Sequence, residues 1–297
     1  MLRPDGSHLV LTRDRARNIA AFDALADGDG AQYAADMDKL GANAPFLFAL
    51  LGGRLWSWDM AKLVAKEAWK RGPRGLSAFF GEALISARHW LQPYYRSEQF
   101  RALMAPWVLH CGLGPESTYS GQMAKVIAFA MEAAGAPIVK GGAQNIITAF
   151  EQLIRDHGGE IRTEADVSEV TVDEAGRATG VVLASGERIA AAEGVICSVT
   201  PNQLYGRMLR NWPGAAPQRE EVRAFAYGKG NMQIHYALKA APRWTDPDLA
   251  KVALLHLTPG LDGVSKAVNE AERGMLPAEP TICLGQPTNF DPSRAPD

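Results

Sequence analysis

The sequence predicts a mixed fold of the α/β type, with enough segregated helix that the whole chain is α+β. Three observations lead to this prediction. From about residue 31 to 135 the apolar residues recur at the spacing of amphipathic helices. After Pro137 the pattern changes to short alternating stretches separated by glycine-rich turns. After a proline-rich connection at 212–217, a long alternating stretch and a further helix near 261–273 follow.

The clearest helix of the first part is expected over residues 119–134. One stripe of this segment is apolar, while Lys125 and Glu132 lie off it. The stripe consists of Met123, Val126, Ile127, Ala130, Met131 and Ala134. A shorter helix is expected over 13–25, and a second one begins near residue 31.

The middle of the chain predicts one helix and several short strands. The helix follows a glycine pair at 141–142 and ends at the glycine pair 158–159, because glycine readily adopts the left-handed conformation after a helix. Its apolar face consists of Ile146, Ile147, Phe150, Leu153 and Ile154. Strands are expected at 161–163, 167–172, 180–183 and 194–199. Pro201 then begins a new helix.

The last third predicts strands and one helix. Apolar residues alternate over 232–238, which indicates a long strand, and 252–257 is its expected partner. A further strand is expected near 281–284.

Composition indicates a folded protein without an electrostatic preference for nucleic acid. Of the 297 residues, 47% are hydrophobic and 22% are charged, which is enough apolar material for a core. Lysine and arginine total 31 against 33 acidic residues, and no basic stripe is present. We therefore expect no nucleic-acid partner.

The three cysteines, Cys111, Cys197 and Cys283, are too few and too scattered for a disulfide framework or a CxxC metal site. Reduced thiols fit a cytoplasmic compartment. No run of 18 apolar residues is present, so no membrane-spanning helix is expected. The first residues lack the apolar region of a secretory signal.

A search for catalytic motifs is negative. The chain contains no GxSxG, HExxH, GxxxxGK[ST] or strand-associated GxGxxG pattern. His89, His110 and His235 have no metal-ligand spacing, so each is interpreted as a packed or surface side chain and no metal is expected. No catalytic residue is assigned.

The apolar stretch APFLFALLGGRLW at 44–56, with Trp58 close behind it, has two interpretations. The first is a buried helix. The second is an apolar substrate entrance or a patch that lies on a membrane surface.

The segment 139–201 contains an ordered set of elements that resembles a known family. The set is a glycine pair, a helix, Gly159-Glu160-Ile161, Val167, a hairpin carrying 180–183, Ser185-Gly186, and a strand ending at Pro201. In this order it is similar to the flavin-domain middle of phytoene dehydrogenase-like proteins, in the amine oxidase and carotenoid desaturase superfamily. The flanks look most like the branch containing the pyridine nucleotide-disulfide oxidoreductase domain 2 proteins.

This resemblance implies three segments and a cofactor. Residues 137–212 would form part of a Rossmann-like FAD/NAD(P)-binding domain. Residues 1–136, mainly helical, and 213–297, with strands and a helix, would pack together on the substrate side. The family's opening strand with GxGxxG and its closing glycine-rich stretch are absent from this sequence. We therefore expect an incomplete chain that holds FAD weakly by itself, and a partner chain or oligomer that covers the missing parts.

The resemblance also implies site residues. Lys140, Gly141, Gly142 and Gln144 would lie near the flavin ring, although a simple turn before a helix explains them equally well. Val167 matches the residue whose main chain contacts the adenine. Ser198 ends the returning strand, where it would meet the cofactor or cap a helix.

The function implied is hydride transfer from an apolar small molecule to flavin. Phe46, Phe48, Trp56 and Trp58 would line the substrate side, with core packing as the alternative for each. Peripheral membrane contact fits such a substrate. The competing hypothesis is a non-catalytic fragment that binds a partner or lipid without FAD.

Overall fold

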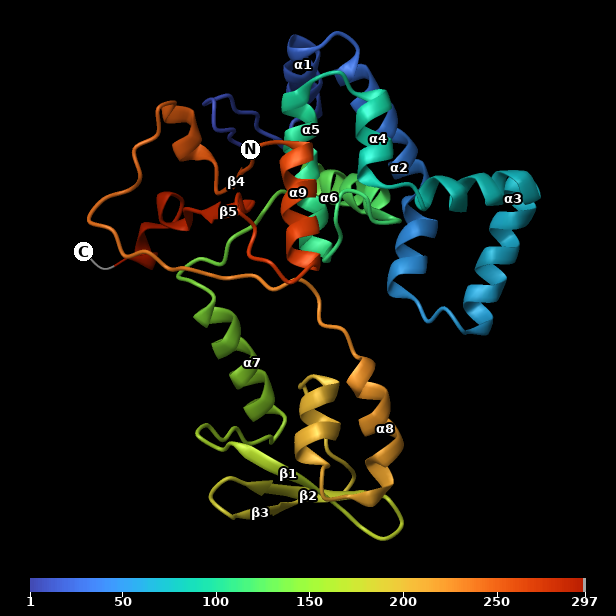
Figure 1. Cartoon of the computed structure of the whole chain (residues 1–297), viewed down its shortest axis with the longest axis vertical. Coiled ribbons are helices and arrows are strands. Elements are labelled where there is room, and N and C mark those ends of the chain that lie inside the picture. The colour runs from blue at the N-terminus through green and yellow to red at the C-terminus, as the bar shows by residue number, and fades with distance from the viewer. Residues whose placement is uncertain (296–297) are drawn as a thin grey trace. The chain divides into compact units, whose positions relative to one another are not determined.

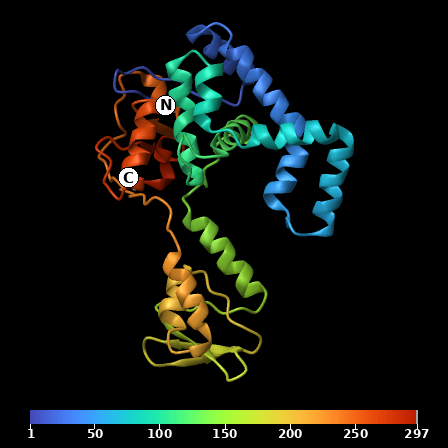
Figure 2. The same cartoon turned by 45° about the vertical axis from the view of Figure 1, so that its right-hand side comes forward.

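The computed structural model describes residues 1–295. The described chain divides into two compact units. The first unit joins Met1–Ala143 to the chain from Met232 onward, and the second unit is Gln144–Asn231 (Figure 1, Figure 2).

The first unit is mainly helical. Four of its helices follow residues that cap them: Asp14, Ser57, Ser86 and Ser97 each accept a hydrogen bond from the backbone N–H three residues later. Such a cap stabilises a helix by about 1 kcal/mol. The helices are α1 (Arg15–Leu25), α2 (Asp29–Gly52), α3 (Trp58–Ala83), α4 (Ala87–Tyr94), α5 (Glu98–Met104), the 3-10 helix η1 (Ala105–Cys111), α6 (Ser120–Ala134), η5 (Pro247–Lys251), α9 (Leu261–Glu272), η6 (Pro287–Asn289) and η7 (Pro292–Arg294).

An aromatic cluster forms the centre of this unit. Phe22 packs edge-on against Tyr33 and Phe100, with ring centroids 5.0 and 4.9 Å apart, and Tyr95 stacks on Phe100 at 4.0 Å. All four side chains are buried. Burying aromatic side chains of this size gives the unit its largest hydrophobic contribution.

Buried carboxylates satisfy the polar ends of the aromatic side chains. Asp36 accepts hydrogen bonds from Trp90 Nε1 at 2.7 Å and from the Tyr95 hydroxyl at 2.6 Å. Glu132 accepts one from the Tyr33 hydroxyl at 2.7 Å. A buried polar group without a hydrogen-bond partner lowers the stability of the fold. These bonds therefore favour this one arrangement of the aromatic side chains.

Helices α2 and α3 form a hairpin joined by residues 53–57 (Figure 1). Helix α3 bends where Gly72 adopts φ 70°, a left-handed conformation that glycine tolerates. Pro73 follows and has no N–H to continue the helical hydrogen bonds. Among the described residues, no helix is both long and apolar enough to cross a lipid bilayer.

The strands of the first unit are β4 (Leu254–Leu257) and β5 (Ile282–Gly285). They are antiparallel, and His256 lies opposite Cys283. The predicted strand over 232–238 is wrong, and β4 pairs with β5 instead. Met232, Ile234, Tyr236 and Leu238 are 54–83% exposed, and within the described part of the chain this backbone pairs with no strand. Alternating apolar and polar residues indicate which side chains share a face of a strand, but they do not identify the strand that it pairs with.

The second unit contains α7 (Gln144–Asp156), a three-stranded antiparallel sheet and short helices. The strands β1 (Val167–Val172), β2 (Ala178–Leu183) and β3 (Arg188–Ala190) lie in sequence order, as a meander. The short helices are the π-helix η2 (Asn202–Met208), η3 (Pro213–Ala215), α8 (Ala216–Glu221) and η4 (Val222–Ala224). Val170, Leu209 and Ala215 form the small core between the sheet and these helices.

Two further strand predictions in this unit are wrong. Residues 161–163 and 194–199 are irregular, whereas β3 was not predicted. Val195 and Cys197 pack against the core of the unit and Ile196 is fully exposed, so the side chains alternate as expected, but among the described residues this stretch pairs with no strand. The new helix after Pro201 is present as η2.

The coarse fold class is confirmed, because helices predominate and the described residues form two small antiparallel sheets. The Rossmann-like character of residues 137–212 and the division into three segments stay predictions.

Candidate functional site

The predicted flavin-side loop at 140–142 is a turn that, with the preceding Val139, is hydrogen-bonded to Asp291 and Arg294. Gly141 and Gly142 have φ values of 75° and 102°, which favour glycine. The Gly141 amide donates a hydrogen bond to Asp291 Oδ2 at 2.6 Å, and Arg294 Nη1 donates to Val139 O at 2.9 Å. Nothing lies within 4 Å of the position that a Cβ at Gly142 would take. The loop therefore has one anchored side and open space around Gly142.

Asp291 is an ionised anchor for this loop. The Ser293 hydroxyl, followed by the Gly141 amide, lowers the pKa of this carboxyl below its ordinary value. Its Oδ1 also accepts a hydrogen bond from Ser293 Oγ at 2.5 Å. The Gly141 amide is therefore already bonded, whereas the space beside Gly142 is open.

The six predicted cofactor residues are divided between the two units. Lys140, Gly141 and Gly142 belong to the first unit, whereas the remaining three belong to the second. Those three are Gln144, Val167 and Ser198. Their role in binding a cofactor therefore stays a prediction.

Within the second unit, Val167 opens β1 opposite Leu183, and its carbonyl accepts a hydrogen bond from Arg207 Nη2 at 3.3 Å. Gln144 is the first residue of α7 and is exposed. Ser198 is exposed in an irregular segment before Pro201. Val167 alone of these three lies in a regular strand, which gives its main-chain groups a fixed direction.

The predicted substrate-side residues fall into two environments. Phe46 is only 3% exposed and packs against Phe79 and Phe80, with the Arg71 guanidinium 5.6 Å from its ring centroid. It is a core residue of the α2–α3 hairpin. Phe48, Trp56 and Trp58, in contrast, are exposed.

The end of the hairpin carries an exposed apolar surface, which we call the hairpin tip. Trp56 is fully exposed and Trp58 is 84% exposed. The tip consists of Phe48, Leu51, Leu55, Trp56 and Trp58. Exposed apolar patches of this kind mark binding surfaces on soluble proteins.

Basic side chains accompany the tip along the same hairpin. Residues 54–74 contain six lysines and arginines but only two acidic residues. Lys62, Lys66 and Lys70 recur every fourth residue of α3, which places them along one side of the helix. Both carboxylates are paired, Glu67 with Arg71 at 2.6 Å and Asp59 with Lys62 at 3.7 Å. Aromatic residues next to lysines are typical of helices that lie on anionic membranes.

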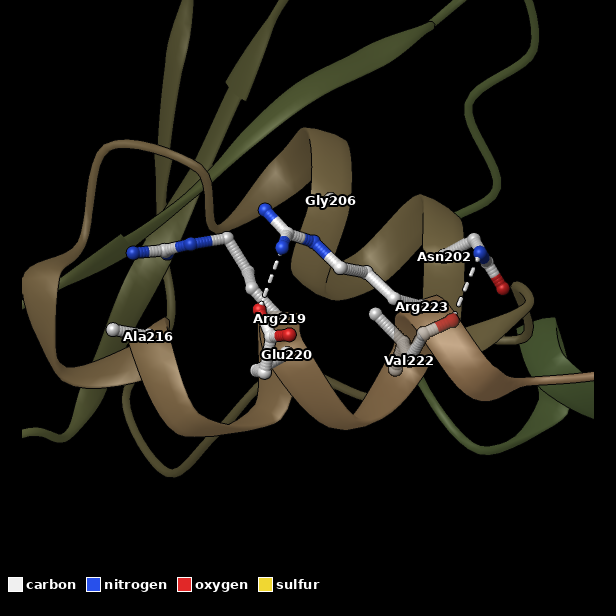
Figure 3. Close-up of a pocket in the computed structure, with 7 residues that line it drawn as sticks. All are labelled: Asn202, Gly206, Ala216, Arg219, Glu220, Val222 and Arg223. Carbon is white, nitrogen blue, oxygen red and sulfur yellow. Dashed lines mark hydrogen bonds and ion pairs between the residues drawn. The ribbon is translucent and has the colours of Figure 1, made fainter.

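The second unit contains a polar cavity of about 440 Å³ (Figure 3). Arg223 pairs with Glu220 at 2.8 Å, and Asn202 Nδ2 donates to Val222 O at 3.3 Å. The lining residues are Asn202, Gly206, Ala216, Arg219, Glu220, Val222 and Arg223. A second cavity of about 690 Å³ lies between the β1–β2 turn and the segment 208–214. Neither cavity is lined by a predicted cofactor residue.

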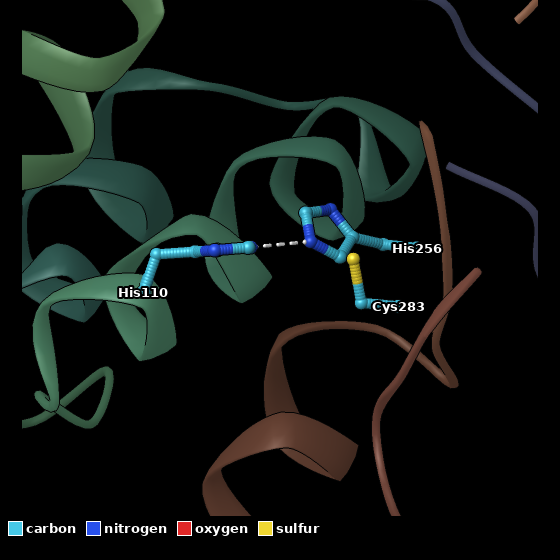
Figure 4. A group of neighbouring side chains, drawn as sticks. All are labelled: His110, His256 and Cys283. Atoms are coloured by element: carbon cyan, nitrogen blue, oxygen red, sulfur yellow. Dashed lines mark hydrogen bonds between the residues drawn. The ribbon is translucent and has the colours of Figure 1, made fainter. Parts of the chain in front are cut away.

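Sequence reasoning missed one group of chemically active side chains in the first unit. His110, His256 and Cys283 each offer one candidate ligand atom, and these atoms lie within 4.8 Å of one another (Figure 4). The two Nε2 atoms are 2.9 Å apart. Burial and the adjacent His110 ring lower the pKa of His256 to about 3, and burial also lowers the pKa of His110. Both rings are therefore neutral at physiological pH.

No spacing rule could have found this group. His110 and His256 are 146 residues apart, and Cys283 reaches them only because β4 and β5 pair. The cysteine next to His110 in the sequence is Cys111, whereas the fold places the distant Cys283 in the group. A prediction of the β4–β5 register would have supplied the signal.

Comparisons with curated proteins identify a group of relatives. The phytoene desaturase (neurosporene-forming) of Cereibacter sphaeroides is 25% identical over 297 residues, which cover 99% of this chain and 54% of that protein. The chain is similar to carotenoid desaturases. The Rhodobacter capsulatus phytoene desaturase (neurosporene-forming) is 27% identical over 210 residues, covering 70% of this chain and 37% of that protein. A hydroxyneurosporene desaturase of Cereibacter sphaeroides is 27% identical over 218 residues, covering 73% of this chain and 42% of its own length.

The chain spans about half the length of the first of these relatives and less of the other two. No family model matches the sequence. No solved structure matches it significantly. The similarity supports the desaturase-like oxidoreductase family expected from segment 139–201, whereas the narrower branch and the incomplete chain stay predictions.

Proposed function

We propose that this chain is part of an oxidoreductase of the phytoene desaturase type that acts on an apolar, polyene-like substrate. The observation that carries the proposal is the exposed hairpin tip on a chain that is similar over almost its whole length to a phytoene desaturase. A substrate of this kind partitions into membranes, so an enzyme that acts on it needs an apolar surface to receive it.

The hairpin tip and the lysines of α3 supply complementary parts of this surface. Trp56 and Trp58 would enter the boundary between headgroups and acyl chains, where tryptophan is favoured. Lys62, Lys66 and Lys70 would face anionic headgroups, each contributing roughly 1 kcal/mol near such a surface. The hairpin would hold the protein on the membrane that contains its substrate.

We propose FAD as the oxidant. When bound, it supplies an acceptor for the hydride removed from a substrate C–H bond, while the second hydrogen leaves as a proton and a C=C bond forms. The open space at Gly142 fits the close approach of a flat ring. The Gly141 amide is bonded to Asp291 and would have to leave it before it could donate to the ring.

We therefore expect the chain to bind FAD weakly when it is purified alone. Nanomolar affinity corresponds to about −12 kcal/mol. Such affinity requires pyrophosphate contacts at a glycine-rich helix N-terminus, and the sequence contains no GxGxxG motif. The main-chain contact proposed at Val167 contributes roughly 1 kcal/mol per hydrogen bond.

The second candidate is a lipid-binding or partner-binding module without flavin chemistry. It is favoured by the absence of a GxGxxG motif from the sequence, because that motif binds the cofactor pyrophosphate. It shares the hairpin tip with the first candidate but needs no oxidant.

Flotation with anionic vesicles, followed by flavin titration, tests both candidates. The chain should float with the vesicles, and the double variant Trp56→Ala/Trp58→Ala should bind about tenfold more weakly or worse. Trp212→Phe, which changes a tryptophan of the second unit, is the control. Unchanged vesicle binding in the double variant would contradict the role of the tip. Vesicle binding with no FAD binding at any concentration would favour the second candidate.

A further inference from the structure

We propose that His110, His256 and Cys283 bind one divalent transition-metal ion of the Zn²⁺ type in the first unit. This proposal is independent of the proposed flavin chemistry, because it uses none of the residues assigned to cofactor or substrate.

The three side chains converge from three separate elements. His110 lies on η1, His256 on β4 and Cys283 on β5 (Figure 4). His256 and Cys283 are directly opposite each other in the antiparallel pair, so their side chains project from the same face of the sheet. The fold therefore places an imidazole–thiol pair in register and directs a second imidazole toward it.

The spacing of the imidazoles is close to that of two metal ligands. Their Nε2 atoms are 2.9 Å apart. Two nitrogens bound to Zn²⁺ at about 2.0–2.1 Å in tetrahedral geometry would be separated by about 3.3 Å. A shift of a few tenths of an ångström thus converts the hydrogen-bonded pair into a pair of ligands.

The proton balance of binding is simple. In the metal-free pair, one Nε2 carries the proton and donates it to the other. Metal binding requires that this proton move to Nδ1 of the same ring, which changes the tautomer but not the charge. The Cys283 thiol loses its proton to solvent as the metal–sulfur bond forms.

The ligand set selects the class of metal. Two imidazoles and a thiolate suit Zn²⁺, Co²⁺ and Cu²⁺, whereas Mg²⁺ and Ca²⁺ prefer oxygen ligands. His256 is buried, but His110 and Cys283 are exposed, so an ion can enter from solvent. Three protein ligands leave the fourth tetrahedral position for water or another small ligand.

Trp107 forms a wall beside the group. Its ring lies 4.6 Å from the His256 ring and 5.2 Å from the His110 ring, measured between centroids. Residues 107 and 110 align on η1 because side chains three apart eclipse in a 3-10 helix. The buried Trp107 Nε1 has no hydrogen-bond partner among residues 1–295. A water or anion bound to the metal would provide a hydrogen-bond acceptor for the Trp107 N–H.

Cobalt titration of the chelator-treated chain tests the proposal. We expect one Co²⁺ per chain, with a thiolate-to-metal charge-transfer band and visible bands of tetrahedral intensity. Zn²⁺ should displace Co²⁺, and Mg²⁺ should not. Cys283→Ser should abolish the charge-transfer band. His110→Ala should weaken Zn²⁺ binding by at least about tenfold.

Matched controls separate this site from adventitious binding. Cys197→Ser and His235→Ala change a cysteine and a histidine outside the group and should leave the stoichiometry and spectrum unchanged. Circular dichroism of each variant checks that it folds, and the exposed positions of His110 and Cys283 allow their replacement without a core defect. A Co²⁺ spectrum without the thiolate band, or affinity unchanged in both Cys283→Ser and His110→Ala, would overturn the proposal.

Discussion

Tyr33 and Tyr95 are single buried residues whose pKa values make the stability of the first unit depend on pH. Burial, followed by the Asp36 carboxylate, raises the pKa of Tyr95. Burial and the bond to Glu132 raise the pKa of Tyr33. Both phenols stay protonated in the folded chain at pH values where an unfolded tyrosine ionises.

We predict alkaline destabilisation from these two residues. Above about pH 10 the unfolded chain binds fewer protons than the folded chain, so the free energy of unfolding falls by up to about 1.4 kcal/mol per pH unit for each tyrosine. Denaturant titrations from pH 9 to 11.5 measure this slope. Tyr95→Phe should reduce the slope, with Tyr94→Phe at an exposed position as the control. An equal slope in Tyr95→Phe and the parent would show that Tyr95 does not carry the effect.

Replacement of Gly142 tests whether the loop at 140–142 binds the flavin ring. Gly142→Val should lower FAD affinity, because the isopropyl group would occupy the open space beside the turn. It should cost only about 1–2 kcal/mol of stability, from the unfavourable left-handed backbone. Gly186→Val is a matched control, since Gly186 also has a positive φ and open space but lies in a hairpin turn. Fluorescence titration measures the affinity. Equal affinity in Gly142→Val and the parent would remove Gly142 from the site.

At the scale of elements, α7 shows that a sequence pattern can predict where a helix forms without predicting what covers its apolar face. The helix forms where periodicity places it, with the expected apolar residues on it. In the described structure, however, none of its residues is buried, and Phe150 is 61% exposed. Periodicity predicts the helix because it reports local geometry, whereas coverage of the face depends on elements distant in sequence.

We predict that Phe150→Ser leaves the free energy of unfolding of this chain within about 0.5 kcal/mol of the parent, as for other exposed positions. Phe22→Ala, at a fully buried aromatic position, should cost about 3–5 kcal/mol. Urea denaturation measures both. A large loss in Phe150→Ser would mean that the apolar face of α7 is covered in solution.

At the scale of the whole molecule, sequence reasoning captured the helical first part and the meander at 167–183. It failed at 194–199 and 232–238, because a strand needs a partner backbone that alternation does not identify. The hairpin tip was visible in the stretch 44–56, although only the structure separates buried Phe46 from exposed Trp56. The group of His110, His256 and Cys283 depends on β4–β5 register and could not be derived from spacing.

Turnover of a membrane-dissolved polyene is the most direct test of the proposed oxidoreductase. The chain would be incubated without oxygen in anionic vesicles that contain phytoene, with FAD at concentrations high enough to overcome weak binding. We predict bleaching of the oxidised flavin together with a longer-wavelength polyene absorption, both reduced by Trp56→Ala/Trp58→Ala. Oxidised flavin and unchanged phytoene, in samples where the chain is bound to the vesicles and FAD is bound to the chain, would contradict the account.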